Sequence, residues 1–169
     1  FFVAAHFAYA LAVAMYLREA SLTLALAVQL ISISWVIRKF DLPVMGWLLK
    51  LVVAVAVCRL TLNPWLSQYP VDVHWSLWTY GGATFCCWLA GRQLVDFPRL
   101  QDWTQGAFVH LFALTVFAEL RYWLYDGNVF AFEYSAIEAG LDMAVFGTLG
   151  LIYHWRERFS TELAWLYRI

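Results

Sequence analysis

The sequence predicts an all-α protein, a polytopic bundle of about six transmembrane helices. First, 63% of the 169 residues are hydrophobic and only 14% are charged, whereas a soluble domain has roughly 25% charged residues. Second, the apolar residues fall into six long stretches separated by polar connections. Third, Pro43, Pro64, Pro70 and Pro98 all fall in those connections, where a missing N–H breaks no helical hydrogen bond.

Each apolar stretch is close to the length of about 20 residues that crosses a bilayer. The remaining residues, 156–169, have mixed polarity and predict a cytoplasmic-side amphipathic tail or the start of a further element. Because the sequence opens without a Met or the charged n-region of a signal peptide, we expect a piece of a longer membrane protein. The six expected spans are residues 1–17, 20–37, 45–62, 75–91, 104–120 and 134–155.

The distribution of Lys and Arg predicts an orientation in the membrane. The connections after the first, third and fifth spans hold three of these residues, and the rest of the chain holds eight. Cytoplasmic loops carry the excess of Lys and Arg, so we expect both ends of this segment to be cytoplasmic. The net charge of −1, without a basic run, excludes nucleic acid and leaves membrane lipids as the surrounding partner.

Side chains that hold metals or cofactors are dispersed along the chain. Cys86 and Cys87 are adjacent and would point about 100° apart on a helix, and no two of the four histidines have the i, i+4 spacing of paired ligands. We therefore expect no metal and no cofactor. Ser, His and acidic residues do not share one depth, so hydrolysis is not indicated. An enzyme acting on a lipid-linked substrate is a distant third functional hypothesis.

Charged residues in and beside the last two apolar stretches are the main candidates for a functional site. Glu138 and Asp142 are four residues apart and would lie on one helix face about 6 Å from each other. Two carboxylates in hydrocarbon repel, so at least one should be protonated or paired. Arg59 lies at a depth that matches that of Asp142 and is its expected partner, and Arg121, which ends the preceding span, could reach Glu138. The sequence thus predicts an intramembrane cluster of Arg59, Glu119, Arg121, Glu138 and Asp142.

Small residues predict positions where helices pack closely. Gly140, Ala144 and Gly147 follow one another at i, i+4 and i+7, on the side of the last span away from the acids. Such residues let helix backbones approach each other. Gly82 and Cys86 have the same four-residue spacing in the fourth span. We expect these five residues to pack against other helices of the bundle or against another subunit.

Three stretches together resemble a known family: "CRLTLNPWL", "FAELRYWLYDG" and "EYSAIEAGLDMAVFGTLGLIY". They are similar to the large bacterial multi-spanning family named for domain of unknown function 2339. One helix of that family ends in Arg-x-x-Leu-Asn-Pro, and a later one ends in Glu-x-Arg before a helix that opens near Glu-Ala-Gly. The matching residues are Arg59, Leu62, the loop motif Asn63 and Pro64, Glu119, Arg121, Glu138, Ala139 and Gly140.

The resemblance implies a location and a longer parent protein, and it implies no reaction. It suggests a bacterial inner-membrane protein with many more helices and an N-terminal soluble or coiled-coil part. The chain departs from the family pattern at Tyr122 and Tyr125, where His or Phe is expected, and in the additional Asp142. The motif residues coincide with the predicted charged cluster.

Two functional hypotheses from different classes follow. The first is a structural or assembly component, a scaffold, of a multi-helix membrane complex. Its partners would be other helices of the same longer chain, further copies in a homo-oligomer, or other subunits. The alternative is a transporter or channel segment in which Glu138 and Asp142 form a proton- or ion-coupled site. Transport sites lie between broken helices, and no expected span has a central Gly or Pro break, which favours the scaffold.

Overall fold

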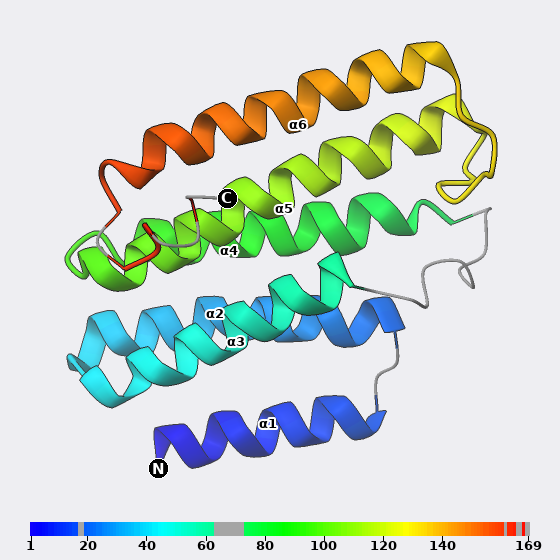
Figure 1. Ribbon diagram of the computed structural model, residues 1–169. Helices are drawn as coiled ribbons and strands as arrows, with labels where there is room; N and C mark the ends of the chain where they lie inside the picture. The colour runs from blue at the N-terminus through cyan, green and yellow to red at the C-terminus, as the bar shows by residue number, and fades with distance from the viewer. Residues whose placement is uncertain (17–18, 63–72, 161, 165–166, 168–169) are drawn as a thin grey trace.

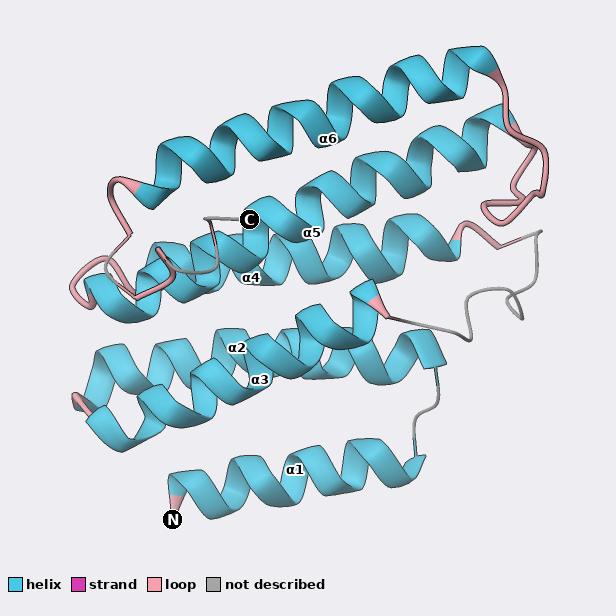
Figure 2. Cartoon of the chain, in the orientation of Figure 1, coloured by secondary structure: helices cyan, strands magenta, loops and turns pink. Residues whose placement is uncertain are grey.

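Six α-helices and one short π-helix form the described part of the chain. This computed structural model describes residues 1–16, 19–62, 73–160, 162–164 and 167. Within those residues every regular element is helical (Figure 2). The elements are α1 Phe2–Tyr16, α2 Glu19–Phe40, α3 Pro43–Thr61, η2 Leu77–Gly81, α4 Gly82–Gln93, α5 Pro98–Leu124 and α6 Ala136–Glu157.

Local sequence explains where several helices begin and end. Pro43 and Pro98 occupy the first positions of α3 and α5, where the fixed φ of proline suits a helix. Ser135 precedes α6, and its Oγ accepts a hydrogen bond from the Glu138 amide, as an N-cap residue does. Asp41 follows α2 with φ 48°, the left-handed conformation that commonly ends a helix.

The helices form a bundle with α1 and α6 at opposite edges (Figure 1). Between them α2, α3, α4 and α5 share an apolar core, while α1 packs mainly on α2 and α6 mainly on α5. The N-terminus, the α2–α3 and α4–α5 connections and the end of α6 lie at the same end of the bundle (Figure 1). The core includes Leu30, Ile33, Leu49, Cys87 and Leu111, each at most 1% exposed.

The fold class agrees with the bundle of membrane helices predicted from the sequence. Among the described residues, α1 is a shorter apolar helix, and η2 and α4 together form the expected span 75–91. α5 is longer than the expected 104–120, because the helix begins directly at Pro98 and continues to Leu124. Four segments are long and apolar enough to cross a membrane: Ser21–Phe40, Val44–Thr61, Pro98–Leu124 and Ala136–Glu157.

The π-helix is a feature that the sequence analysis did not predict. It covers Leu77–Gly81 and runs directly into α4 at Gly82. Within it, Tyr80 is 6% exposed and donates its hydroxyl to the Leu60 carbonyl at 2.9 Å. That carbonyl lies in the last turn of α3, where helix carbonyls lack an intrahelical partner. The π-helix therefore helps to satisfy the end of α3 inside the apolar bundle.

Candidate functional site

Five polar residues gather where α5 ends and α6 begins. We call them the α5–α6 cluster: Arg121, Tyr125, Tyr134, Glu138 and Asp142. The last turn of α5 supplies the arginine, the connection between the helices supplies both tyrosines, and α6 supplies both acids. Because α5 and α6 are adjacent antiparallel helices, this end of the pair brings a basic residue of one helix beside the acids of the other.

Glu138 is the centre of the cluster, and only 1% of its side chain is exposed. Its Oε1 lies 3.1 Å from Nη1 of Arg121, and its Oε2 accepts a hydrogen bond from the Tyr125 hydroxyl. Nη2 of Arg121 donates to the Ala131 carbonyl at 2.6 Å. The hydrogen bond to Glu138 raises the pKa of Tyr125, in keeping with the phenol as the donor of this bond. The arrangement is a buried, paired carboxylate.

Asp142 lies one helical turn further along α6 and has fewer partners. Its Oδ2 accepts a hydrogen bond from the Tyr134 hydroxyl at 3.1 Å. Its Oδ1 is buried without a hydrogen-bond partner among the described residues, and so is Oε1 of Glu138, whose contact with Arg121 is an ion pair only. Desolvation, followed by the hydrogen bond to Asp142, raises the pKa of Tyr134. A buried acceptor without a donor is costly, so this oxygen is a position where a hydrogen-bond donor from elsewhere would bind favourably.

Glu119 belongs to a separate group beside η2. Its Oε2 lies 2.7 Å from Nε2 of His74, and its Oε1 accepts a hydrogen bond from Ser76 at 2.9 Å. The His74 ring stacks on Tyr122, with ring centroids 3.8 Å apart. Glu119 thus ties the chain before η2 to α5, and the adjacent aromatic rings shield that contact.

Arg59 lies in the last turn of α3 and donates Nε to Oγ1 of Thr23 on α2 at 2.8 Å. The ion pairs between described residues do not join it to Asp142, which was its expected partner. Instead, the contact between Arg59 and Thr23 links α3 to α2.

The predicted five-residue cluster is therefore divided among three groups. Arg121 and Glu138 form an ion pair with Asp142 nearby, while Glu119 and Arg59 have other partners. The depth of a residue along its span could be estimated from the sequence. Which helices lie next to each other could not. The loop motif Asn63 and Pro64 lies outside the described residues.

A contact of the half-buried His110 is a feature that sequence reasoning missed. Nε2 of His110 lies 3.0 Å from Oγ1 of Thr61, and Nδ1 lies 2.7 Å from the Tyr153 hydroxyl. The contact links α3, α5 and α6 through the middle of α5. An ionisable residue within an apolar span is the sequence signal that could have indicated it.

The opposite end of the bundle holds a second polar group, which is formed by the segment after α6. Glu162 accepts hydrogen bonds from Nζ of Lys50 and from Nε1 of Trp103, the latter at 2.8 Å. The hydrogen bond from Lys50 lowers the pKa of Glu162. Asp102 pairs with Arg156 at 3.0 Å. Glu162 and the other described residues after α6 therefore lie against α3 and α5.

The predicted packing residues fall into two environments. A Cβ at Gly82 would lie 2.7 Å from a leucine side chain of α2, and Cys86 is buried in the core. These two residues thus lie inside the bundle. By contrast, a Cβ at Gly140 or Gly147 would meet nothing within 4 Å, and Ala144 is exposed. The small-residue face of α6 points outward.

Comparison with known proteins gives this helical bundle a family. No curated protein and no solved structure matches the chain. A family described as "Predicted membrane protein (DUF2339)" matches residues 1–169. That description names a membrane location and no activity. The match covers the whole chain, which therefore belongs to the DUF2339 family of membrane proteins.

Proposed function

We propose that the chain is a structural component of a multi-helix complex in the bacterial inner membrane, and that α6 is its assembly helix. The observation that carries this proposal is the outward face of α6. Gly140, Ala144 and Gly147 form a shallow stripe along it, and a Cβ added at either glycine would meet nothing within 4 Å in the described part of the chain. Small residues permit close contact between helices in lipid. The occupant we propose is α6 of a second copy.

The α5–α6 cluster supports this role because it fixes the rotation of α6. Glu138 and Asp142 lie on the side of the helix opposite the small-residue stripe, and Glu138 is paired with Arg121 on α5. Rotating α6 would expose or unpair a buried charge, which is costly in an apolar medium. The ion pair therefore keeps the stripe directed away from α5 and toward an incoming helix.

The alternative function is proton- or ion-coupled transport through Asp142. The unpartnered Oδ1 of this residue favours it, because a titrating group needs room for its proton. The enclosure of Glu138 opposes it, since this carboxylate is 1% exposed and held by both Arg121 and Tyr125. A static, paired acid is better suited to packing than to loading and releasing an ion.

A matched pair of substitutions tests the assembly role. Ala144→Leu adds bulk to the stripe, and Ala8→Leu adds the same bulk at an exposed position of α1 at the opposite edge. The mass of the full chain in lipid nanodiscs would be measured by native mass spectrometry. We expect an oligomer for the wild type and for Ala8→Leu, and a smaller species for Ala144→Leu. A wild-type monomer, or equal masses for all three, would refute the role.

Asp142→Asn separates the two functions. If Asp142 has a structural role, the Asp142→Asn variant should have a lower melting temperature or a smaller oligomer mass than the wild type. In a transporter, the same change should abolish a pH-dependent flux into proteoliposomes while folding and mass stay unchanged. Wild-type protein without flux, together with a less stable Asp142→Asn variant, would support the structural role.

We also propose that both ends of this segment face the cytoplasm. The support is the count of Lys and Arg, because eight of the eleven lie outside the first, third and fifth connections. Labelling of single cysteines from either side of intact spheroplasts would test it. If the cysteine of an Arg158→Cys variant reacted with an impermeant reagent added from outside, the proposed orientation would be wrong.

A further inference from the structure

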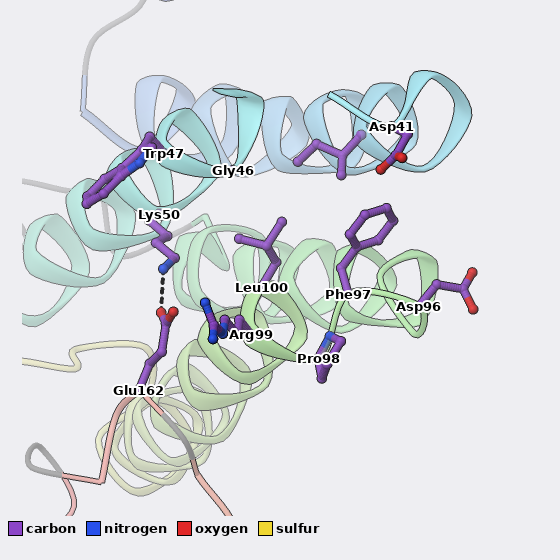
Figure 3. A pocket seen from close by; sticks show the side chains of 11 residues that line it. Asp41, Gly46, Trp47, Lys50, Asp96, Phe97, Pro98, Arg99, Leu100 and Glu162 are labelled. Carbon is purple, nitrogen blue, oxygen red and sulfur yellow. Dashed lines mark hydrogen bonds and ion pairs between the residues drawn. The ribbon is translucent and has the colours of Figure 1, made fainter. Parts of the chain in front are cut away.

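A cavity of about 520 Å³ opens at the end of the bundle where α3 and α5 begin (Figure 3). Its walls come from the α2–α3 connection, the first turns of α3 and α5, and the segment after α6. Two candidate spans, Val44–Thr61 and Pro98–Leu124, begin at this cavity. The cavity therefore lies at the level where apolar helices leave the membrane.

One side of the cavity is positively charged. Lys50 and Arg99 point into the same region, and Glu162 reaches toward them (Figure 3). Nζ of Lys50 lies between two aromatic rings, 5.6 Å from the centroid of Trp47 and 5.5 Å from that of Trp103. Such rings favour a cation, so the ammonium is held in place at the cavity wall.

The N-terminus of α5 adds to this positive potential. Phe97, Pro98, Arg99 and Leu100 line the cavity, and the N-cap residue Phe97 provides no side-chain hydrogen bond. The first N–H groups of a helix carry a partial positive charge and favour an anion. The acids Asp41 and Asp96 lie on the side of the cavity away from Lys50 (Figure 3). Asp41 and Asp96 are therefore separated from the two cations, whereas Glu162 lies beside Lys50 and pairs with it.

The remaining walls are apolar. Phe97 and Leu100 line the cavity together with Trp47, whose ring is 78% exposed. Tryptophan at the end of a membrane span is typical of the headgroup region. A small inorganic anion would contact only the cationic side chains. A lipid would also place its glycerol and first acyl carbons against the apolar walls.

We propose that this cavity binds the phosphate of an anionic phospholipid between Lys50 and Arg99, with Trp47 beside the glycerol. Glu162 then has a second role, because its carboxylate already occupies the position of an anion next to Lys50. The carboxylate and the lipid phosphate compete for one ammonium. Lipid binding displaces the Glu162 carboxylate from Lys50.

Binding to the full-length chain in detergent tests this site, with dioleoylphosphatidylglycerol as the probe and native mass spectrometry as the readout. We expect at least a tenfold loss of affinity in the variant Lys50→Gln with Arg99→Gln, and a several-fold gain in Glu162→Gln, which removes the competing charge. Arg92→Gln is the matched control, because Arg92 is exposed near the same bundle end and does not line the cavity. Its affinity should equal that of the wild type.

Two further outcomes would overturn the proposal. If the wild type, the double variant and Glu162→Gln bound the lipid with equal affinity, the lipid would bind at a site other than this cavity. Displacement of phosphatidylglycerol by millimolar inorganic phosphate would identify free phosphate as the ligand instead. If the double variant does not fold, Glu162→Gln decides, since an unchanged or lower affinity in that variant contradicts competition. Phosphatidylcholine binding as tight as phosphatidylglycerol binding would contradict selection for an anionic lipid.

Discussion

Nη1 of Arg121 lies 3.1 Å from Oε1 of Glu138, and this ion pair joins the end of α5 to the start of α6. The glutamate is also the third residue of α6, where its amide is capped by Ser135. One residue thus supports the start of its own helix through its backbone and the contact with α5 through its side chain. The interhelical contact depends on both.

Removing the arginine should destabilise the bundle strongly. Arg121→Ala leaves Glu138 buried and without its counter-charge, and breaking such a pair costs about 3 kcal/mol or more. Unfolding of the detergent-solubilised chain would measure the loss. The double variant, Arg121→Ala with Glu138→Gln, should recover part of it because no buried charge remains. Equal stability of Arg121→Ala and wild type would show that the pair contributes nothing.

The Glu119 group should make a smaller contribution. Ser76→Ala removes the donor to Oε1 of Glu119, and a lost buried hydrogen bond costs about 1 kcal/mol. Hydrogen exchange at the amides of residues 74–76 should become faster, because this segment loses one of its ties to α5. Ser21→Ala, at an exposed position of α2, is the control and should leave those amides unchanged.

The contact between Glu162 and Lys50 should depend on pH. The hydrogen bond from Lys50 holds the pKa of Glu162 below its ordinary value of 4.5. A depressed carboxyl pKa stabilises the folded state above the unfolded pKa, and this stabilisation is lost as the pH falls through the folded pKa. The difference in melting temperature between wild type and Glu162→Gln should therefore persist at pH 6 and shrink below about pH 4.5. A difference independent of pH would exclude this ionic contribution.

Gly106 should be required for docking the segment after α6. A Cβ there would lie 2.5 Å from the Tyr167 hydroxyl and 3.1 Å from Cδ1 of Leu163. Gly106→Ala should displace both side chains and cost roughly 1 kcal/mol, as overpacking does. Gly150→Ala is the matched control, because a Cβ at that position meets nothing within 4 Å. Faster proteolysis after Arg158 in Gly106→Ala alone would confirm the displacement.

Much of the fold was predictable because apolar length is a local property. A stretch of about 20 hydrophobic residues has few alternatives to a membrane helix, and prolines mark its ends. The expected spans therefore agree with α2, α3 and α6 to within a few residues. The π-helix Leu77–Gly81 was not predictable, nor was the contact of its Tyr80 with a carbonyl of another helix.

The candidate site was predictable only in part, for a related reason. The pairing of Arg121 with Glu138 connects sequential antiparallel helices, so matching depths were enough to predict it. Arg59 has a matching depth too, yet it contacts Thr23, because the side-by-side order of helices depends on packing of all of them. His74 and Tyr134 gave no sequence signal, as their partners come from other turns and connections.

The sequence by itself determined that this chain is a membrane helix bundle, that its acids need partners, and that α6 carries small residues. These properties follow from composition and helical spacing, which are independent of neighbours. Only the tertiary structure decided which acid is enclosed, which face of α6 is left uncovered, and that Glu162 returns to Lys50. Those outcomes depend on contacts between residues far apart in the chain, where the packing of α2–α5 determines which side chains can meet.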